Sequence, residues 1–423
     1  MLAEMTNINK VQQLFELKAA PTCFGLIAPV AVLQSKALVI VFALLSIFLS
    51  IGIYRNLKNS FKHFGDAKFL IFLFVLFVCW IFSTLFWTID FASSSTKFLK
   101  LFTISLMGLG VFIGLASINV SARIRIVNAL VYGACAAVAL VVSRYCLFLI
   151  LGDIEGGQSS FFSPSVLNPG LTVITIMLWP ACMRLFVQSR WKTLSIFLFS
   201  YVVVLALSDS GASMLALFAG GVMVLASIWR RKVVMYLLGA LTAVFMMTAP
   251  FVTPQPTSNT PVAEKMTFLP SSTQHRLYIW EFTANKALEK PFRGWGIDSS
   301  RSIPGGHDKP PIGQHYLPLH PHNGALQIWL ELGAPGAIMG AILFALLILK
   351  LLNRPNVNNR YVSAALVGSL VSFLVVASTA YSLWQSWWFA TGWMLAGALV
   401  VFSKQSETLT KLRKKREGKA YFG

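Results

Sequence analysis

The sequence predicts an all-α polytopic membrane protein with about twelve transmembrane helices and one long non-cytoplasmic loop that contains an amphipathic helix. Of the 423 residues, 56% are hydrophobic and only 12% are charged. Mean hydropathy is +0.69, which is far too apolar for a soluble chain. Many windows reach the roughly 20 apolar residues that cross a bilayer. Positive charge collects in the short gaps between these runs, the pattern that orients helices in a membrane.

Apolar runs between polar breaks define the spans. Residues 1–252 carry nine of them, at roughly 20–35, 37–53, 68–88, 98–117, 127–151, 166–187, 193–208, 211–229 and 233–252. Residues 323–402 carry three more, at roughly 323–352, 361–381 and 384–402. The first span is the weakest because Pro21 and Pro29 interrupt it, so a count of eleven stays open.

Basic residues decide the orientation, because short cytoplasmic loops carry an excess of Lys and Arg. Every second connection is basic: Arg55, Lys58, Lys62 and Lys68; Arg123 and Arg125; Arg184, Arg190 and Lys192; Arg230, Arg231 and Lys232; Lys350, Arg354 and Arg360. The alternate connections hold Asp90 with Lys97, Asp153 with Glu155, and Asp209. The tail, residues 403–423, is basic, so both termini are predicted to be cytoplasmic. The net charge of +20 is explained by basic residues that orient the helices in the membrane. Membrane lipids are expected partners, and nucleic acid is not.

Residues 253–322 form one connection that is much longer than the others, on the non-cytoplasmic side. A loop of this length is uncommon unless it has a function. It opens with the Pro/Thr-rich stretch 253–261. Residues 273–290 then place apolar side chains at helical spacing, which predicts an amphipathic helix at the membrane surface. Pro291, Gly294 and Gly296 end that helix.

Four histidines gather at the end of this loop: His307, His315, His320 and His322. Histidine is the commonest zinc ligand, so a metal site is one interpretation. No cysteine or glutamate joins them at a metal-ligand spacing, and we expect no metal and no cofactor. Hydrogen-bonding histidines at the membrane surface are the alternative. The five cysteines lie in or beside apolar runs, and we expect no disulfides.

His322 differs from the other histidines because of the residues directly after it. The pattern His322-Asn323-x9-Gly333-x-x-Gly336 stands at the head of a late span. It resembles the signature of the O-antigen ligase family, which shares its core with O-antigen polymerases and protein O-oligosaccharyltransferases. A second landmark is similar to the family's Arg-x-x-x-Trp helix and Gly-x-Gly turn: Arg276 to Trp280, and then residues 291–296. The resemblance covers roughly residues 160–350, including Leu167-Asn168-Pro169.

The resemblance implies a reaction and the residues that would carry it out. A glycan would move from undecaprenyl diphosphate to a lipid A-core sugar hydroxyl at the periplasmic face of the bacterial inner membrane, with inversion. A hydroxyl needs a base poised near neutral pH, which suits His322. A diphosphate needs fixed cations, which suits Arg276, with Arg293 or Arg301 beside it. His320, Asn323 and Trp280 are further candidates for contacting substrate.

One departure from the family concerns an arginine in a Ser-Arg-Gly-like turn. The corresponding place here, residues 208–213, has no arginine. Arg144, deep in its span, is one substitute for the phosphate contact. The alternative is that Arg144 snorkels toward the membrane surface.

Structural alternatives remain open for each candidate. Asn323 is equally suited to cap a helix, Gly333 and Gly336 to break or pack one, and Arg276 to anchor the loop at the interface. Among functions, polymerase and protein-directed transferase are runners-up, and a transporter is the more distant alternative. Spans such as 384–402 contain no charged residue, which argues against a path for substrate through the membrane.

Overall fold

A computed structural model describes residues 15–55, 68–151, 164–208, 210–253, 270–309, 314–352 and 359–420. Within these ranges the chain is helical and has no β-strand. Nine stretches of the described residues are long and apolar enough to cross a membrane. The prediction of an all-α polytopic membrane protein is therefore confirmed. Some predicted features lie outside the described residues: most of the Pro/Thr-rich stretch 253–261, and the connection residues Lys58, Lys62, Asp153, Glu155, Asp209 and Arg354.

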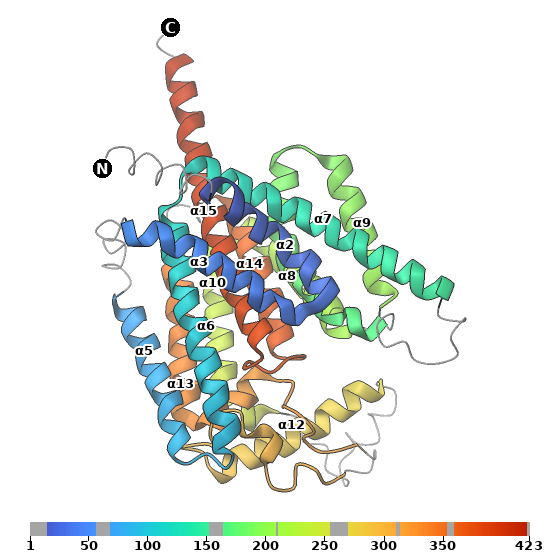
Figure 1. The fold of residues 1–423 in the computed structure, drawn as a ribbon, viewed down its shortest axis with the longest axis vertical. Helices are drawn as coiled ribbons and strands as arrows, with labels where there is room; N and C mark the ends of the chain where they lie inside the picture. The colour runs from blue at the N-terminus through green and yellow to red at the C-terminus, as the bar shows by residue number, and fades with distance from the viewer. Residues whose placement is uncertain are drawn as a thin grey trace.

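The long helices have these bounds: α2 (Ala20–Gln34), α3 (Leu38–Arg55), α5 (Lys68–Ser83), α6 (Phe91–Ser117), α7 (Val120–Leu151), α8 (Asn168–Val187), α9 (Trp191–Ala206), α10 (Gly211–Val252), α12 (Ser271–Glu289), α13 (Gly324–Leu352), α14 (Arg360–Ala377) and α15 (Ser386–Ala420). Short turns of other helix types are η1 (Phe15–Ala19), η2 (Ser35–Ala37), η4 (Thr84–Phe86), η5 (Pro164–Leu167) and η7 (Ser299–Ser302). In Figure 1, α12 lies across one end of the bundle, and the red C-terminal part of α15 extends from the other.

The helix α10 accounts for two of the predicted spans. Its 42 residues would extend about 63 Å if straight, twice the thickness of a bilayer core. Arg230 interrupts it with non-helical backbone angles, φ −131° and ψ 46°. Before this bend α10 packs on α14, and after it on α13, where Gly340 lies against Met246. The segments 211–229 and 233–252 are therefore two separate helices that meet at Arg230.

Each of the twelve predicted segments coincides with a helix or half-helix of the described chain. The turn η2 separates α2 from α3 within one continuous apolar stretch, Leu17–Ser50. The apolar helix α9, with 16 residues, is shorter than any of the nine stretches that could cross a membrane. The predicted amphipathic helix at 273–290 is confirmed as α12. The predicted basic tail continues α15 as a helix through Ala420.

Two ends of the bundle can be distinguished by contacts between helix termini. At one end Arg125 donates to the carbonyl of Leu17, and Phe186 packs on Tyr361. At the other end Thr172, Ser213 and Tyr381 join through their hydroxyl groups. The basic connections thus gather at the first end, which we call the basic end. The second, which carries α12 and the histidines, is called the site end.

Candidate active site

Two glycine landmarks of the sequence meet where α13 breaks. Gly333 has φ +68° and ψ −170°, a conformation that only glycine adopts readily. A Cβ on Gly333 would come within 2.5 Å of the carbonyl oxygen of Phe292. Pro335 comes two residues later and has no N–H to donate. The motif glycine therefore breaks α13 and lets the turn after α12 pack into the break.

The turn at residues 291–296 satisfies the backbone groups that this break exposes. Trp295 N–H donates to the carbonyl of Leu330 (2.8 Å), and Gly296 N–H to that of Glu331 (2.9 Å). In return, Ala334 N–H donates to the carbonyl of Pro291 (2.7 Å). Gly296 (φ +98°) and Gly294 (φ +64°) have positive φ. The landmarks that resemble the family signature thus form one interlocked unit.

His322 stands at the turn where α13 begins. Its φ is +53°, which is uncommon for a residue with a side chain. Its Nδ1 faces the carbonyl oxygen of Ala380. Because a carbonyl oxygen only accepts, Nδ1 must carry the proton and Nε2 holds a free lone pair. The backbone therefore fixes His322 in the tautomer that a general base requires.

The neighbours of His322 hold this turn, residues 320–323, which we call the histidine turn. Asn323 Oδ1 accepts from the N–H groups of Ala325 (3.1 Å) and Leu326 (3.2 Å). Asn323 thus caps α13, as one of the two interpretations of its sequence position expected. Trp280 on α12 donates from Nε1 to the carbonyl of Pro321 (3.0 Å). This contact ties the histidine turn to the amphipathic helix.

His320 lies directly against His322, with ring centroids 4.1 Å apart. Its Nδ1 accepts from the backbone N–H of His322 (3.2 Å), so its proton is on Nε2. Burial lowers the pKa of His320 to about 2, and the ring of His322 adds to this effect. Three further positive charges contribute, those of Arg301, Lys97 and Arg276. His320 is therefore a neutral donor surrounded by cations.

Arg276 lies half-buried on α12, one helical turn before Trp280. Burial lowers the pKa of the Arg276 guanidinium, and the nearby Tyr381 opposes that shift. Burial also lowers the pKa of His322 to about 4; the hydrogen bond to Ala380 opposes this, and the charge of Arg276 adds to it. Within the described part of the chain, no acceptor hydrogen-bonds or pairs with the Arg276 guanidinium. A half-buried cation without a carboxylate favours an anionic ligand.

We call Lys97, Arg276 and Arg301 the cation cluster; they come from α6, α12 and η7. Lys97 pairs with Asp298 at 3.4 Å, and Arg301 is exposed. Sequence reasoning missed Lys97, although it is the one basic residue in a connection otherwise poor in positive charge. Tyr381 lies beside Arg276, a member of this cluster, and burial raises the pKa of the Tyr381 hydroxyl.

Two other predicted arginines lie apart from the histidine turn. Arg293 is exposed in the turn after α12, and the last residue of that helix, Glu289, lies about 20 Å along it from Arg276. Arg144 is buried (6% exposed) and donates from Nη1 to the carbonyl of Val32 at 2.7 Å. Val32 lies in the last turn of α2, where carbonyls lack intrahelical partners. Arg144 therefore stabilises a helix end.

The remaining loop histidines bind backbone carbonyls. His275 Nε2 contacts the carbonyl of His315 (2.8 Å), and His315 Nδ1 contacts that of His307. His307 Nε2 in turn contacts the carbonyl of Arg301 (3.1 Å). Among the described residues, no three side chains of the metal-binding types converge. These contacts match the hydrogen-bonding interpretation of the histidines.

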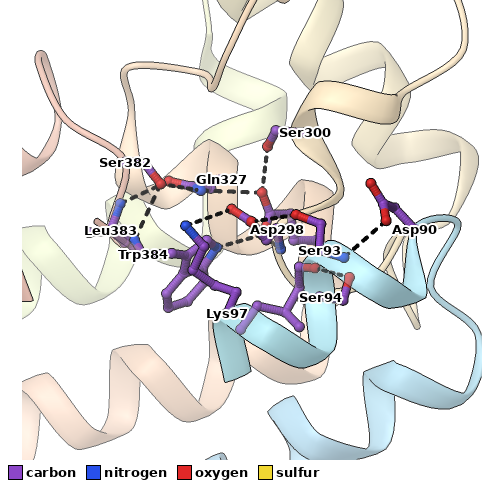
Figure 2. Close-up of polar contacts among 12 residues, drawn as sticks. Asp90, Ser93, Ser94, Lys97, Asp298, Ser300, Gln327, Ser382, Leu383 and Trp384 are labelled. Carbon is purple, nitrogen blue, oxygen red and sulfur yellow. Dashed lines mark hydrogen bonds and ion pairs between the residues drawn. The ribbon is translucent and has the colours of Figure 1, made fainter. Parts of the chain in front are cut away.

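A buried polar network lies behind the site, with Asp298, Ser300, Gln327, Ser382 and Trp384 at its centre (Figure 2). Glu331 on α13 joins them and is 0% exposed. The network connects the N-terminus of α6, the segment around η7, α13 and the connection between α14 and α15. No sequence pattern indicated this grouping, because the four segments are far apart in the chain.

The comparisons with known proteins agree with this geometry. Residues 194–341 match the family model described as O-Antigen ligase. A Rickettsia conorii protein named "Putative polysaccharide ligase" is 30% identical over 336 residues, covering 76% of this chain and 77% of its own length. A Rickettsia prowazekii protein of the same name is 31% identical over 76% of this chain and 78% of its own length. A Rickettsia felis protein is 28% identical over 81% and 83%.

The matched region contains α12, the histidine turn and the broken first part of α13, which are the elements that carry His322 and Arg276. The match also includes the bend at Arg230 and residues 208–213, which contain no arginine. The family match, these relatives and the interlocked glycine landmarks together show that the chain belongs to the O-antigen ligase family.

Proposed function

We propose that the protein is an O-antigen ligase, which transfers a glycan from undecaprenyl diphosphate to a sugar hydroxyl of the lipid A-core. The observation that carries the proposal is the histidine turn. It presents a free Nε2 lone pair on His322 beside Arg276, a cation that has no acceptor among the described residues. The names of the relatives, polysaccharide ligases, agree with this chemistry.

His322 acts as general base in the proposed reaction. Nε2 takes the proton of the acceptor hydroxyl as its oxygen bonds to the anomeric carbon of the glycan. The bond from that carbon to the diphosphate oxygen breaks, and undecaprenyl diphosphate leaves with the electron pair. A single displacement inverts the anomeric centre. Because the diphosphate leaves as a stable anion, the reaction needs no general acid and no pair of carboxylates. The carbonyl of Ala380 stabilises the imidazolium that results.

The cation cluster holds the diphosphate. Arg276 supplies a guanidinium fork that matches phosphate oxygens, and Lys97 and Arg301 add positive charge around His320. His320 offers a neutral N–H donor from Nε2 to the same anion. Fixed positive charge stabilises a leaving diphosphate without a proton donor. The proposed reaction therefore requires no metal or cofactor, and we expect transfer to continue in chelator.

Roles for the remaining predicted residues depend on where they lie. Trp280 and Asn323 hold the histidine turn and act on substrate through His322. Arg293, exposed at the end of α12, is placed to contact lipid headgroups or the carrier before it enters. Arg144 acts on α2 and has no direct part in the transfer.

The site end faces the periplasm of a bacterial inner membrane in this proposal. The basic end then faces the cytoplasm, with both termini, as the positive charge of its connections favours. The donor enters from the membrane toward Lys97 on α6, and the lipid A-core acceptor approaches from the same leaflet. Residues 253–322 form the periplasmic loop that carries the cation Arg276 to the histidine turn.

A cell deleted for the gene tests the proposal. We expect lipopolysaccharide without its polymer ladder, while polymer accumulates on undecaprenyl diphosphate. Single repeat units attached to the core would instead indicate a polymerase. Normal lipopolysaccharide with unglycosylated proteins would indicate a protein O-oligosaccharyltransferase. Loss of polymer from the periplasm altogether would indicate a transporter.

A further inference from the structure

Glu331 is a fully buried carboxylate that the proposed reaction does not use. It lies on the first part of α13, two residues before the break at Gly333, and is 0% exposed. A buried carboxylate is destabilising unless hydrogen bonds satisfy it. The hydrogen-bond partners of Glu331 therefore show which segments of the chain it holds together.

Four groups surround its two oxygens. Oε2 accepts from Trp384 Nε1 (2.5 Å) and from the backbone N–H of Asp298 (2.5 Å). Oε1 accepts from Gln327 Nε2 (3.2 Å) and from the hydroxyl of Ser300. Three of the four are obligate donors, which an ionised carboxylate satisfies and an amide cannot. The carboxylate therefore fastens two segments, the one around η7 and the connection between α14 and α15, to one point of α13.

The first segment leads to Lys97. Asp298, whose backbone Glu331 holds, has φ +58°. Its carboxylate accepts from the hydroxyl of Ser93 (2.9 Å) and pairs with Lys97 Nζ (3.4 Å). Figure 2 shows Lys97 and Ser93 reaching Asp298 from the same helix, α6. Glu331 thus fixes the residue that sets the position of one member of the cation cluster.

The η7 segment and the connection between α14 and α15 also lead to the rest of the site. Ser300 directly precedes Arg301 in η7. The Gln327 side chain links Glu331 to the connection after α14. Its Nε2 donates to Glu331 and to the hydroxyl of Ser382 (2.8 Å), and its Oε1 accepts from the N–H of Leu383 (3.0 Å). These residues come directly after Ala380 and Tyr381, the acceptor for His322 and the neighbour of Arg276. One carboxylate is therefore connected to the cation cluster and to the base.

We propose that Glu331 is a positioning residue that holds Lys97, Arg301 and the connection carrying Ala380 in one arrangement suited to bind the diphosphate of the donor. The proposal rests on the proposed function for the identity of the donor. It assigns Glu331 no contact with substrate. Because Lys97 and Arg301 lie on different elements, α6 and η7, they keep one arrangement only while the segment that Glu331 holds stays in place.

Glu331→Gln tests this, with Glu289→Gln as the matched control. Glu289 carries the same carboxylate but lies at the surface, in an ion pair with Lys286. Both variants are purified as full chains in nanodiscs. Three quantities are measured: KM and kcat for a glycan linked to undecaprenyl diphosphate, the rise in melting temperature that undecaprenyl diphosphate produces, and the pH dependence of kcat.

We expect Glu331→Gln to raise the donor KM about tenfold or more and to reduce the ligand-induced rise in melting temperature. The acidic limb of kcat should move to lower pH, because a displaced Ala380 carbonyl would stabilise the His322 imidazolium less. Glu289→Gln should match the wild type in all three. A lower melting temperature of Glu331→Gln with wild-type KM and kcat per folded molecule would assign Glu331 a purely structural role and overturn the proposal. Wild-type behaviour in every measurement would overturn it as well.

Failure of the proposed function is distinguishable from failure of this inference. Wild-type protein that binds undecaprenyl diphosphate but transfers no glycan would refute the ligase function. Weaker binding by Glu331→Gln would still support the positioning role. If Glu331→Gln does not purify, Ser300→Ala removes one of the four contacts and keeps the charge. A raised donor KM in Ser300→Ala supports the proposal, and a wild-type KM contradicts it.

Discussion

Arg144 and Arg276 are two arginines near the site end that sequence reasoning proposed for the same anion. Arg144 donates to the carbonyl of Val32 at the end of α2. Arg276 has no acceptor among the described residues and lies beside His322 and Tyr381. Burial alone therefore does not identify a ligand-binding arginine. The difference lies in whether the fold already supplies an acceptor.

The histidines of the loop differ among themselves in a similar way. His275, His307 and His315 each direct a ring nitrogen at a backbone carbonyl within the loop. His322 does so too, but its acceptor, Ala380, lies on a distant connection that also brings Tyr381 beside Arg276. A contact within the loop shapes the loop, whereas the Ala380 contact fixes the ring of the proposed base, His322, from a distant connection.

His322→Ala should have the largest effect. It removes the proposed base while Asn323 still caps α13, so the protein should fold and enter the membrane. We expect transfer to fall by about a thousandfold, within the range found for a general base. The polymer ladder of lipopolysaccharide, seen on a gel, is the measurement. His307→Ala is the matched control, and a normal ladder in His322→Ala would remove this residue from the mechanism.

Arg276→Ala should come next. Loss of the Arg276 guanidinium should reduce kcat/KM about a hundredfold, since the diphosphate would lose its bidentate partner. Arg276→Lys should recover only part of this, because an ammonium keeps the charge and loses the fork. Steady-state kinetics of purified variants provide the measurement. Equal activity of the wild type and Arg276→Ala would leave Arg276 as an interfacial anchor.

The pH dependence should show an acidic limb below the ordinary pKa of histidine. Burial lowers the pKa of His322 to about 4, and only the neutral ring can take a proton. Activity is therefore expected to persist as pH falls below 6.5 and to be lost as pH approaches about 4. The bound diphosphate offsets the charge of Arg276, so the limb of kcat should lie at higher pH than that of kcat/KM. An acidic limb of kcat/KM near pH 6.5 or above would contradict this assignment of the base.

Arg144→Met should have the smallest effect on transfer and a clear effect on stability. It keeps the apolar stem but leaves the carbonyl of Val32 without this donor, at a cost of about 1–3 kcal/mol. We expect a lower melting temperature and unchanged kcat/KM per folded molecule. A loss of donor binding comparable to that of Arg276→Ala would erase the contrast between the two arginines.

Hydropathy predicted the fold because each span is a run of consecutive apolar residues, which local sequence alone shows. Two separate apolar runs, 211–229 and 233–252, were predicted on either side of the bend at Arg230. The break in α13 was one of two alternatives for Gly333, and the structure shows why: the turn at residues 291–296 occupies the space that a side chain would need.

The candidate site could be predicted only in part. His322 and Arg276 were proposed from sequence motifs, whose residues lie close together in the chain. Lys97, Asp298 and Glu331 were not found, because they meet across elements separated by about two hundred residues in one case. The sequence around Arg144 does not show whether its side chain contacts a helix end or a ligand. The answer depends on where α2 ends relative to α7, which only the structure shows.

The central claim is that His322 and the cation cluster move a glycan from a polyprenyl diphosphate to the lipid A-core. The most direct measurement is transfer by the purified protein in nanodiscs, with undecaprenyl diphosphate-linked polymer, lipid A-core and chelator as the only additions. We predict polymer attached to the lipid A-core and free undecaprenyl diphosphate, both absent with His322→Ala. Polymer that stays on its carrier with wild-type protein, with or without added zinc, would contradict the account.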